Sequence, residues 1–140
     1  MQNKPVRVIL DTNLWVSFLI KKDYSTLGSL LFSGQIVLVF SKESLSEFIE
    51  VTQRPKFKKY FSETDVIALT KVIDDYAEFV DVTANITICR DEKDNFLLSL
   101  AVDGNADYLL TGDSDLLVLN PQGHTKIITI SDFFKEITTP

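Results

Sequence analysis

The sequence predicts an α/β fold, a three-layer α/β/α sandwich in which helices cover both faces of a central parallel sheet of four to five strands. Short runs of β-branched and apolar residues alternate along the chain with segments of helical periodicity. These runs are apolar at successive positions, which is typical of strands buried on both faces. No repeat, low-complexity tract or linker interrupts the alternation, so we expect a single domain over residues 1–140.

Five segments have strand character, and helical patterns lie between them. Strands are expected over residues 6–10, 36–40, 79–83, 108–111 and 126–130. Helices are expected over residues 14–20, 25–32, 94–102 and 116–119, and directly after Ser41, Ser62 and Ser131, because serine is a favoured N-cap residue. Asp65, three residues after Ser62, completes the pattern of a capping box.

Composition restricts the class of protein. A hydrophobic content of 45% excludes a disordered chain. No apolar stretch approaches the ~20 residues that a membrane helix needs, and the N-terminus has no apolar signal core, so we expect a cytoplasmic protein without a membrane partner. Cys89 is the single cysteine, which excludes an internal disulfide and fits a reducing compartment.

Four acidic residues lie next to the predicted strands. Asp11 directly follows the first strand, and Asp113 comes just after the fourth. Glu47 lies about two turns into the helix after the second strand, and Asp94 begins the helix that follows a polar loop. Because the carboxyl ends of parallel strands share one edge of a sheet, we expect the four carboxylates to converge there. They would repel one another unless a multivalent cation neutralised them, which predicts a metal site.

The ligand types favour Mg²⁺ or Mn²⁺, which bind few carboxylates, keep several waters and accept phosphate oxygens. Zinc is disfavoured, since His124 and Cys89 are the sole nitrogen and sulfur side chains that usually bind it. A carboxylate and Mg²⁺ centre points to phosphoryl chemistry, in which the metal lowers the pKa of the attacking water.

Each acid also has an ordinary structural role to set against this hypothesis. Asp94 could be an N-cap, and Glu47 a solvated helix residue. Asn13 could bond a ligated water or phosphate, or cap the first helix, and Asp115 is expected to support the site. The other acids that could fill the roles of Glu47 and Asp94 are expected to be exposed; they are Glu43, Glu50 and Asp91.

A formal net charge of −6 argues against broad nucleic-acid binding but leaves room for a local basic groove. Residues 54–61, Arg-Pro-Lys-Phe-Lys-Lys-Tyr-Phe, interleave basic and aromatic residues. Such a segment could follow a single-stranded backbone and stack bases. A loop with its aromatic rings packed inward and its lysines in water is the interpretation that the sequence favours.

Four motifs resemble those of the PIN domain over nearly the whole chain. They are Val-Ile-Leu-Asp11-Thr12-Asn13, Glu47-Phe48, Asp91-Glu-Lys-Asp94-Asn95 and Thr111-Gly112-Asp113-Ser114-Asp115. The likeness is to prokaryotic PIN proteins of the VapC type, which are toxins of toxin-antitoxin systems.

The resemblance implies an α/β/α sandwich with a Mg²⁺- or Mn²⁺-dependent ribonuclease site. The metal-binding acids of the family match Asp11, Glu47, Asp94 and Asp113. Its further acid falls on Asp115, and its polar residue after the first Asp matches Thr12 or Asn13. The same resemblance implies an RNA substrate, an antitoxin partner and a homodimer.

Two other functions stay open at this point. A phosphatase of the haloacid dehalogenase type also places Asp after its first strand, but Asn13 stands where that family needs a second acid. A non-catalytic domain, either receiver-like or a scaffold, could use the acids to bind a cation. A receiver would carry Lys at the end of its last strand, whereas Lys126 lies at the beginning.

Overall fold

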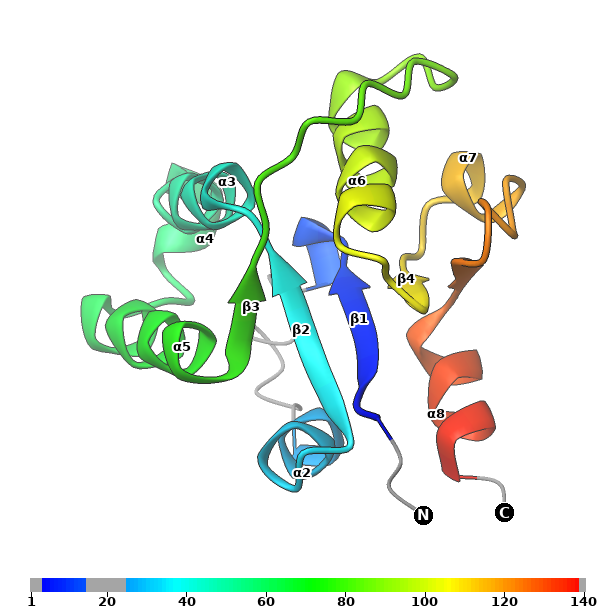
Figure 1. Cartoon of the computed structure of the whole chain (residues 1–140). Helices are drawn as coiled ribbons and strands as arrows, with labels where there is room; N and C mark the ends of the chain where they lie inside the picture. The colour runs from blue at the N-terminus through cyan, green and yellow to red at the C-terminus, as the bar shows by residue number, and fades with distance from the viewer. Residues whose placement is uncertain (1–3, 15–24, 139–140) are drawn as a thin grey trace.

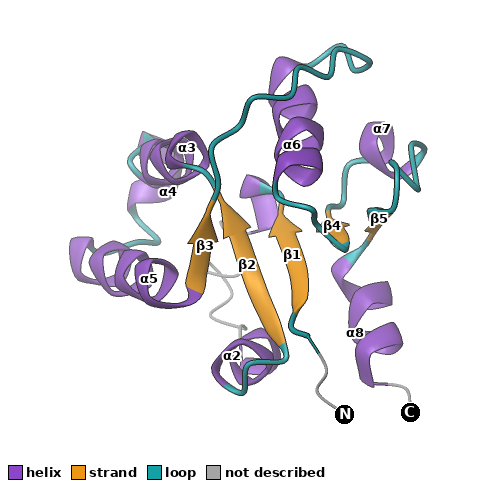
Figure 2. Cartoon of the chain, viewed as in Figure 1, coloured by secondary structure: helices purple, strands orange, loops and turns teal. Residues whose placement is uncertain are grey.

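The computed structural model describes residues 4–14 and 25–138. Five strands form one parallel sheet in the order β3-β2-β1-β4-β5, and helices surround it (Figures 1 and 2). The strands are β1 (Val6–Leu10), β2 (Ile36–Phe40), β3 (Ala77–Phe79), β4 (Tyr108–Leu110) and β5 (Lys126–Ile128). The predicted α/β class and its parallel central sheet are confirmed.

The helices divide between the two faces of the sheet. They are α2 (Ser25–Phe32), α3 (Lys42–Thr52), α4 (Pro55–Lys58), α5 (Glu63–Tyr76), α6 (Glu92–Asp103), α7 (Ser114–Leu117) and α8 (Ile130–Thr138), and residues 12–14 are also helical. Side chains of α2, α3, α5 and α8 share one apolar core with the sheet, and those of α6 and α7 share the other. This division is the expected three-layer sandwich.

Alternation along β1 shows how the strands serve both cores. Val8 and Leu10 pack with the α2, α3, α5 and α8 side, while Ile9 between them packs with the α6 and α7 side. All three are at most 5% exposed. A strand segment with both faces buried is apolar at successive positions, as residues 8–10 of β1 are.

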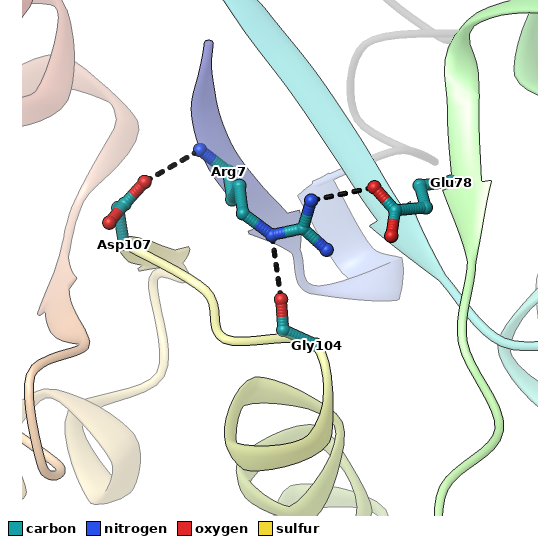
Figure 3. A network of polar contacts seen from close by, with 4 residues as sticks. All are labelled: Arg7, Glu78, Gly104 and Asp107. Atoms are coloured by element: carbon teal, nitrogen blue, oxygen red, sulfur yellow. Dashed lines mark hydrogen bonds and ion pairs between the residues drawn. The ribbon is translucent and has the colours of Figure 1, made fainter. Parts of the chain in front are cut away.

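Arg7 connects the C-terminal end of α6 to the sheet (Figure 3). Its backbone N–H donates to Asp107 Oδ2 at 2.9 Å, its Nε donates to the carbonyl of Gly104 at 2.7 Å, and a guanidinium nitrogen lies 2.6 Å from Glu78 Oε2. Glu78 belongs to β3, two strands away. The Arg7 guanidinium, its main partner, lowers the pKa of the Glu78 carboxyl. One side chain therefore links β1, β3 and the end of α6.

The strand order creates a switch point beside β1. The chain runs from β1 through β2 to β3 on one side, and then places β4 on the other side of β1. The Asp11 N–H donates to the carbonyl of Leu110 at 3.0 Å, so hydrogen bonding to β4 continues one residue beyond the end of β1. In open α/β sheets this position is where ligands bind.

The third strand differs from the expected one over residues 79–83. The structure places β3 at Ala77–Phe79, directly after α5. Val80 still donates to the carbonyl of Phe40 at 2.8 Å, but beyond it the chain leaves the sheet, and the N–H groups of Thr83 and Ala84 donate to Asp103 at the end of α6. The β-branched residues that predicted a strand there lie in the connection to α6.

Several predicted boundaries also shift because capping residues lie elsewhere. Asp91 caps α6, which begins at Glu92 and not at Asp94. Asp113 caps α7, which begins at Ser114 and not at residue 116. The fourth and fifth strands end at Leu110 and Ile128, short of residues 111 and 130. Thr129 Oγ1, in place of Ser131, accepts the N–H of Asp132 at the start of α8.

Other local predictions are confirmed or fall outside the described residues. Ser41 caps α3, and Ser62 with Asp65 forms the expected capping box of α5. The segment expected to be a loop after Arg54 contains the one-turn helix α4. The helix predicted over residues 14–20 lies, apart from Leu14, outside the described residues. Among the helices that the structure describes, none has the length and apolar character needed to cross a membrane.

Gly104 allows α6 to approach the sheet closely. A Cβ built there would lie 2.6 Å from Val39 Cγ1 and 2.9 Å from the carbonyl oxygen of Leu100, and Val39 is buried. We expect Gly104→Ala to lower the free energy of unfolding by about 1–3 kcal/mol through overpacking. Gly112→Ala, where a Cβ meets no atom within 4 Å, should stay close to wild type. Urea unfolding followed by circular dichroism compares the two, and equal midpoints would contradict this account of the packing.

Candidate functional site

A polar pocket of about 270 Å³ lies at the switch point. The residues around it come from the ends of β1 and β4, from α3, and from the start of α6. They are Asp11, Thr12, Asn13, Glu47, Val51, Arg54, Asp91, Lys93, Asp94, Leu97 and Asp113. All four acids predicted to converge line this one pocket.

Asp11 is held by two hydrogen bonds where β1 ends. Its Oδ2 accepts the Thr111 hydroxyl at 2.9 Å, and its Oδ1 accepts the N–H of Asn13 at 3.2 Å. The second bond makes Asp11, and not Asn13, the residue that caps the helical turn at residues 12–14. The carboxylate is half-buried at the wall of the pocket. Because Thr111 follows β4 and Asp11 follows β1, the pairing of these two strands sets the orientation of the Asp11 carboxylate.

Asp113 is fixed in a similar way after β4. Its N–H donates to Thr111 Oγ1 at 3.0 Å, and its Oδ1 accepts the N–H of Asp115 at 2.9 Å, which caps α7. The Thr111 hydroxyl therefore donates to Asp11 and accepts from Asp113. Thr111 itself is fully buried. This threonine joins the two acids that flank the switch point.

Asp94 is the most deeply buried of the four acids, with 8% of its surface exposed. It lies in the first turn of α6, whose N-cap is Asp91, so capping does not account for it. Within residues 4–14 and 25–138, its carboxylate has no hydrogen-bond donor and no ion-pair partner. Burial, followed by the charges of the nearby carboxylates, raises its pKa to about 6. The carboxylates concerned are Asp113, Asp91, Asp11 and Asp115.

Glu47 reaches the pocket from α3 and is paired with a cation. Its Oε1 lies 3.6 Å from Lys93 Nζ, and the two side chains are 29% and 58% exposed. Exposed pairs of this kind contribute about 0–1 kcal/mol, so a divalent ion could displace the lysine from Glu47, or a phosphate could displace Glu47 from the lysine, at small cost. Glu43 and Glu50, on the same helix, are exposed and lie outside the pocket, as expected.

The remaining predicted residues divide between the pocket and its surroundings. Thr12 and Asn13 line it. Asp115 is exposed and does not line it, and its Oδ2 lies 3.9 Å from a guanidinium nitrogen of Arg90. Asp91 is exposed as expected, yet it contributes to the rim.

Sequence reasoning missed Thr111, which lies behind the pocket, and Lys93, which lines it, and it placed Arg54 in the basic segment 54–61 without expecting it beside the acids. A polar residue directly after the buried strand β4 was the available signal for Thr111. Arg54 and Lys93 line an otherwise acidic pocket, and no periodic pattern marks them. They lie beside the acids because α3 and α6 bring together segments that are distant in the chain.

The donor set suits a hard divalent cation. Asp94 is buried near other carboxylates and has no counterion among the described residues, and a bound cation would offset the burial and the repulsion that raise its pKa. In the described conformation, however, no three acidic, histidine or cysteine side chains of residues 4–14 and 25–138 are arranged to hold one ion together. Side-chain rotation, including release of Glu47 from Lys93, would have to accompany binding.

The raised pKa predicts that Asp94 destabilises the metal-free protein at neutral pH. Its carboxyl prefers to be protonated in the folded state, so the destabilisation is fully present above pH 6 and is lost as pH falls toward the ordinary value of 3.8. We expect Asp94→Asn in EDTA to increase the free energy of unfolding by about 1–3 kcal/mol at pH 7, and by less at pH 4.5. Urea titrations at both pH values measure the gain. A loss of stability at pH 7 would contradict the electrostatic account.

Comparisons with known proteins agree with the fold and the order of the motifs. The chain is 27% identical to the uncharacterized protein MJ1680 of Methanocaldococcus jannaschii, over all of this chain and 90% of that protein. Its fold matches the crystal structure of VapBC2 from Rickettsia felis bound to a DNA fragment from their promoter, with a TM-score of 0.58 and 18% identity, over 87% of this chain and 98% of that one. The family model of the PIN domain matches residues 7–115. This chain therefore belongs to the PIN domain family.

Proposed function

We propose that this protein is a Mg²⁺- or Mn²⁺-dependent endoribonuclease that hydrolyses phosphodiester bonds in RNA. The observation that carries the proposal is the buried Asp94 carboxylate, which faces other carboxylates and has no counterion among the described residues. Burying such a charge costs several kcal/mol unless a cation compensates it. A fold that maintains this arrangement at its ligand-binding edge is organised for a cation.

Asp11, Asp94 and Asp113 would hold the metal, and Glu47 would complete the site or orient the attacking water. When bound, the metal supplies a water of lowered pKa and neutralises charge on the phosphate. Thr111 positions Asp11 and Asp113 through its hydroxyl, and the N–H of Asn13 fixes the other oxygen of Asp11. Thr12 and Asn13 line the pocket where a phosphate would lie.

Release of Glu47 would leave Lys93 free at the same pocket. Its ammonium could then contact a phosphate oxygen and support the negative charge of the substrate. The exchange is favourable because the metal cation would replace Lys93 beside Glu47, and the phosphate anion would replace Glu47 beside Lys93. Lys93 would thus act on the substrate, while Glu47 acts on water or metal.

We further infer that the protein is the toxin of a toxin-antitoxin pair, with an antitoxin that binds it and a homodimeric state. VapBC2 of Rickettsia felis supports this inference by its fold. A cytoplasmic location is part of the same proposal.

The alternatives are less consistent with the pocket. Asn13 is exposed at the rim, and its side chain supplies no acid for aspartyl-phosphate chemistry. Lys126 pairs in register with Tyr108 at the beginning of β4 and lies 2.7 Å from Glu136. It is therefore at the opposite edge of the sheet from the acids, which disfavours a receiver. A metal-binding scaffold stays as the second candidate because it uses the same carboxylates.

Asp11→Asn and Asp113→Asn should each lower Mn²⁺-dependent cleavage of a single-stranded RNA by at least about 100-fold, because the ligands that place the metal lose charge. Glu43→Gln, on the exposed side of α3, is the matched control and should cleave as wild type does. Gel analysis of a labelled RNA measures the rate, and circular dichroism verifies folding. Full activity of both Asn variants would refute the assignment, while metal binding by wild type without cleavage would favour the scaffold.

Metal affinity should depend on the proton that Asp94 carries. With a pKa of about 6, the carboxyl is mostly ionised at pH 7 and mostly protonated at pH 5, so a proton competes with the cation. We expect the dissociation constant for Mn²⁺ to rise by about tenfold from pH 7 to pH 5. Isothermal titration calorimetry on wild type and Asp94→Asn tests this. The variant should bind weakly with little pH dependence, and an equal pH dependence in both proteins would place the titrating group elsewhere.

A further inference from the structure

A basic segment follows α3 and includes α4. Residues 51–62 contain four cations and no acid, in a chain with 20 acidic and 14 basic residues. We call Arg54, Lys56, Lys58, Lys59 and Tyr60 the α4 strip. Four cations within six residues of compact chain occupy about 8 Å along the helix axis, which concentrates positive charge locally.

The aromatic residues of this segment divide between core and solvent. Phe61 is 8% exposed and Phe57 packs against the core of the α2, α3, α5 and α8 side, with their ring centroids 6.4 Å apart. Inward packing, which the sequence favoured, is therefore right for these two rings. Tyr60 differs, because 44% of its surface is exposed. The two inward rings anchor the strip, and Tyr60 stays partly exposed at the surface.

The lysines of the strip are exposed, and no acid of the described residues pairs with them. By contrast, Arg7, Lys93 and Lys126 each have a carboxylate partner. In a strongly acidic protein, three neighbouring lysines without carboxylates are available to an anionic partner. Within the part of the chain that the structure describes, the one ion pair of Arg54 is with the exposed Glu50, 3.7 Å away, and this contact is weak.

The strip adjoins the acidic pocket. Arg54 lines that pocket, together with Glu47 and Val51 of α3. Helix α4 follows α3 after a short connection and lies next to it (Figure 1). A polyanion whose scissile phosphate sits in the pocket would therefore meet Arg54 first and the lysines of α4 next.

We propose that the α4 strip binds the backbone of single-stranded nucleic acid that extends from the acidic pocket, with Tyr60 stacking on an unpaired base. Because the strip would form the path of the RNA substrate, this proposal rests on the proposed function. A single strand is favoured over a duplex because an exposed ring next to cations can stack only on a base that is free of its partner. The short length of the strip fits contacts with a few nucleotides.

The present contacts of the lysines do not oppose this role. Lys59 Nζ lies 5.1 Å from the centroid of the Tyr60 ring, and Lys56 Nζ lies 4.9 Å from that of Phe57. An exposed cation–π contact contributes about 0.5–1 kcal/mol, whereas stacking a base on an aromatic ring contributes about 1–3 kcal/mol. Moving Lys59 from the ring to a phosphate while a base takes its place is therefore favourable.

Fluorescence anisotropy with a labelled oligouridine, in EDTA so that no cleavage occurs, tests the strip. Replacing Lys56, Lys58 and Lys59 together by Gln should raise the dissociation constant by roughly ten- to a hundredfold at about 0.1 M salt, and should reduce the slope against log salt by about 2. Tyr60→Leu should weaken binding by about 5- to 150-fold, which corresponds to the loss of one stacked base.

Matched controls isolate charge and stacking. Lys42→Gln with Lys71→Gln removes exposed cations from α3 and α5, outside the strip, and should bind as wild type does. Tyr60→Phe keeps the ring and should also bind as wild type does. A fully paired RNA duplex of the same length should bind more weakly, with no effect of Tyr60→Leu, and oligodeoxythymidine separates RNA from DNA preference.

The outcomes test nucleic-acid binding by the strip separately from the proposed nuclease activity. Loss of oligouridine binding in the lysine and Tyr60→Leu variants supports the strip, even where wild type with Mn²⁺ cleaves no RNA. Binding and cleavage at wild-type levels in those variants overturns the strip, even where Asp11→Asn abolishes cleavage. Failure of the wild type to bind any single strand also overturns it.

Discussion

The main constraint on the pocket is the burial of Asp94 among carboxylates at the carboxyl ends of β1 and β4. Asp94 is buried beside Asp113, Asp91 and Asp11, and its pKa rises to about 6 because burial and these neighbours oppose its charge. Such a cluster reduces stability unless a cation is bound. The fold tolerates it because two packed apolar cores lie below the pocket and supply the stability that the acids remove.

The pairing of β1 with β4 fixes the positions of Asp11 and Asp113 in spite of this repulsion. Thr111 follows β4 and Asp11 follows β1, and the register of Leu10 with Leu110 sets them side by side. The buried hydroxyl then holds Asp11 and the N–H of Asp113 together. Because this hydroxyl contacts both residues, Thr111 is a positioning residue for the two acids.

Two cations, Lys93 and Arg54, lie beside the acids of the pocket. Lys93 pairs with Glu47 at the rim, and Arg54 leads from the pocket to the α4 strip. None of the described cations pairs with Asp94. Under the proposed function, the unpaired Asp94 carboxylate would be available to a metal, and the exposed cations would face the substrate.

The sequence by itself determined the α/β class, the strands at 6–10 and 36–40, the helix at 25–32 and the serine caps of α3 and α5, because these features depend on neighbouring residues. It also identified the four acids, since Asp after a buried strand is costly without a partner. Only the tertiary structure decided that Asp91 caps α6 and leaves Asp94 buried, that the third strand ends at Phe79, and that Arg54 and Lys93 join the pocket. The contact between Thr111 and Asp11 spans 100 positions of sequence, and a pattern read over a few neighbouring residues carries no information about such a distance.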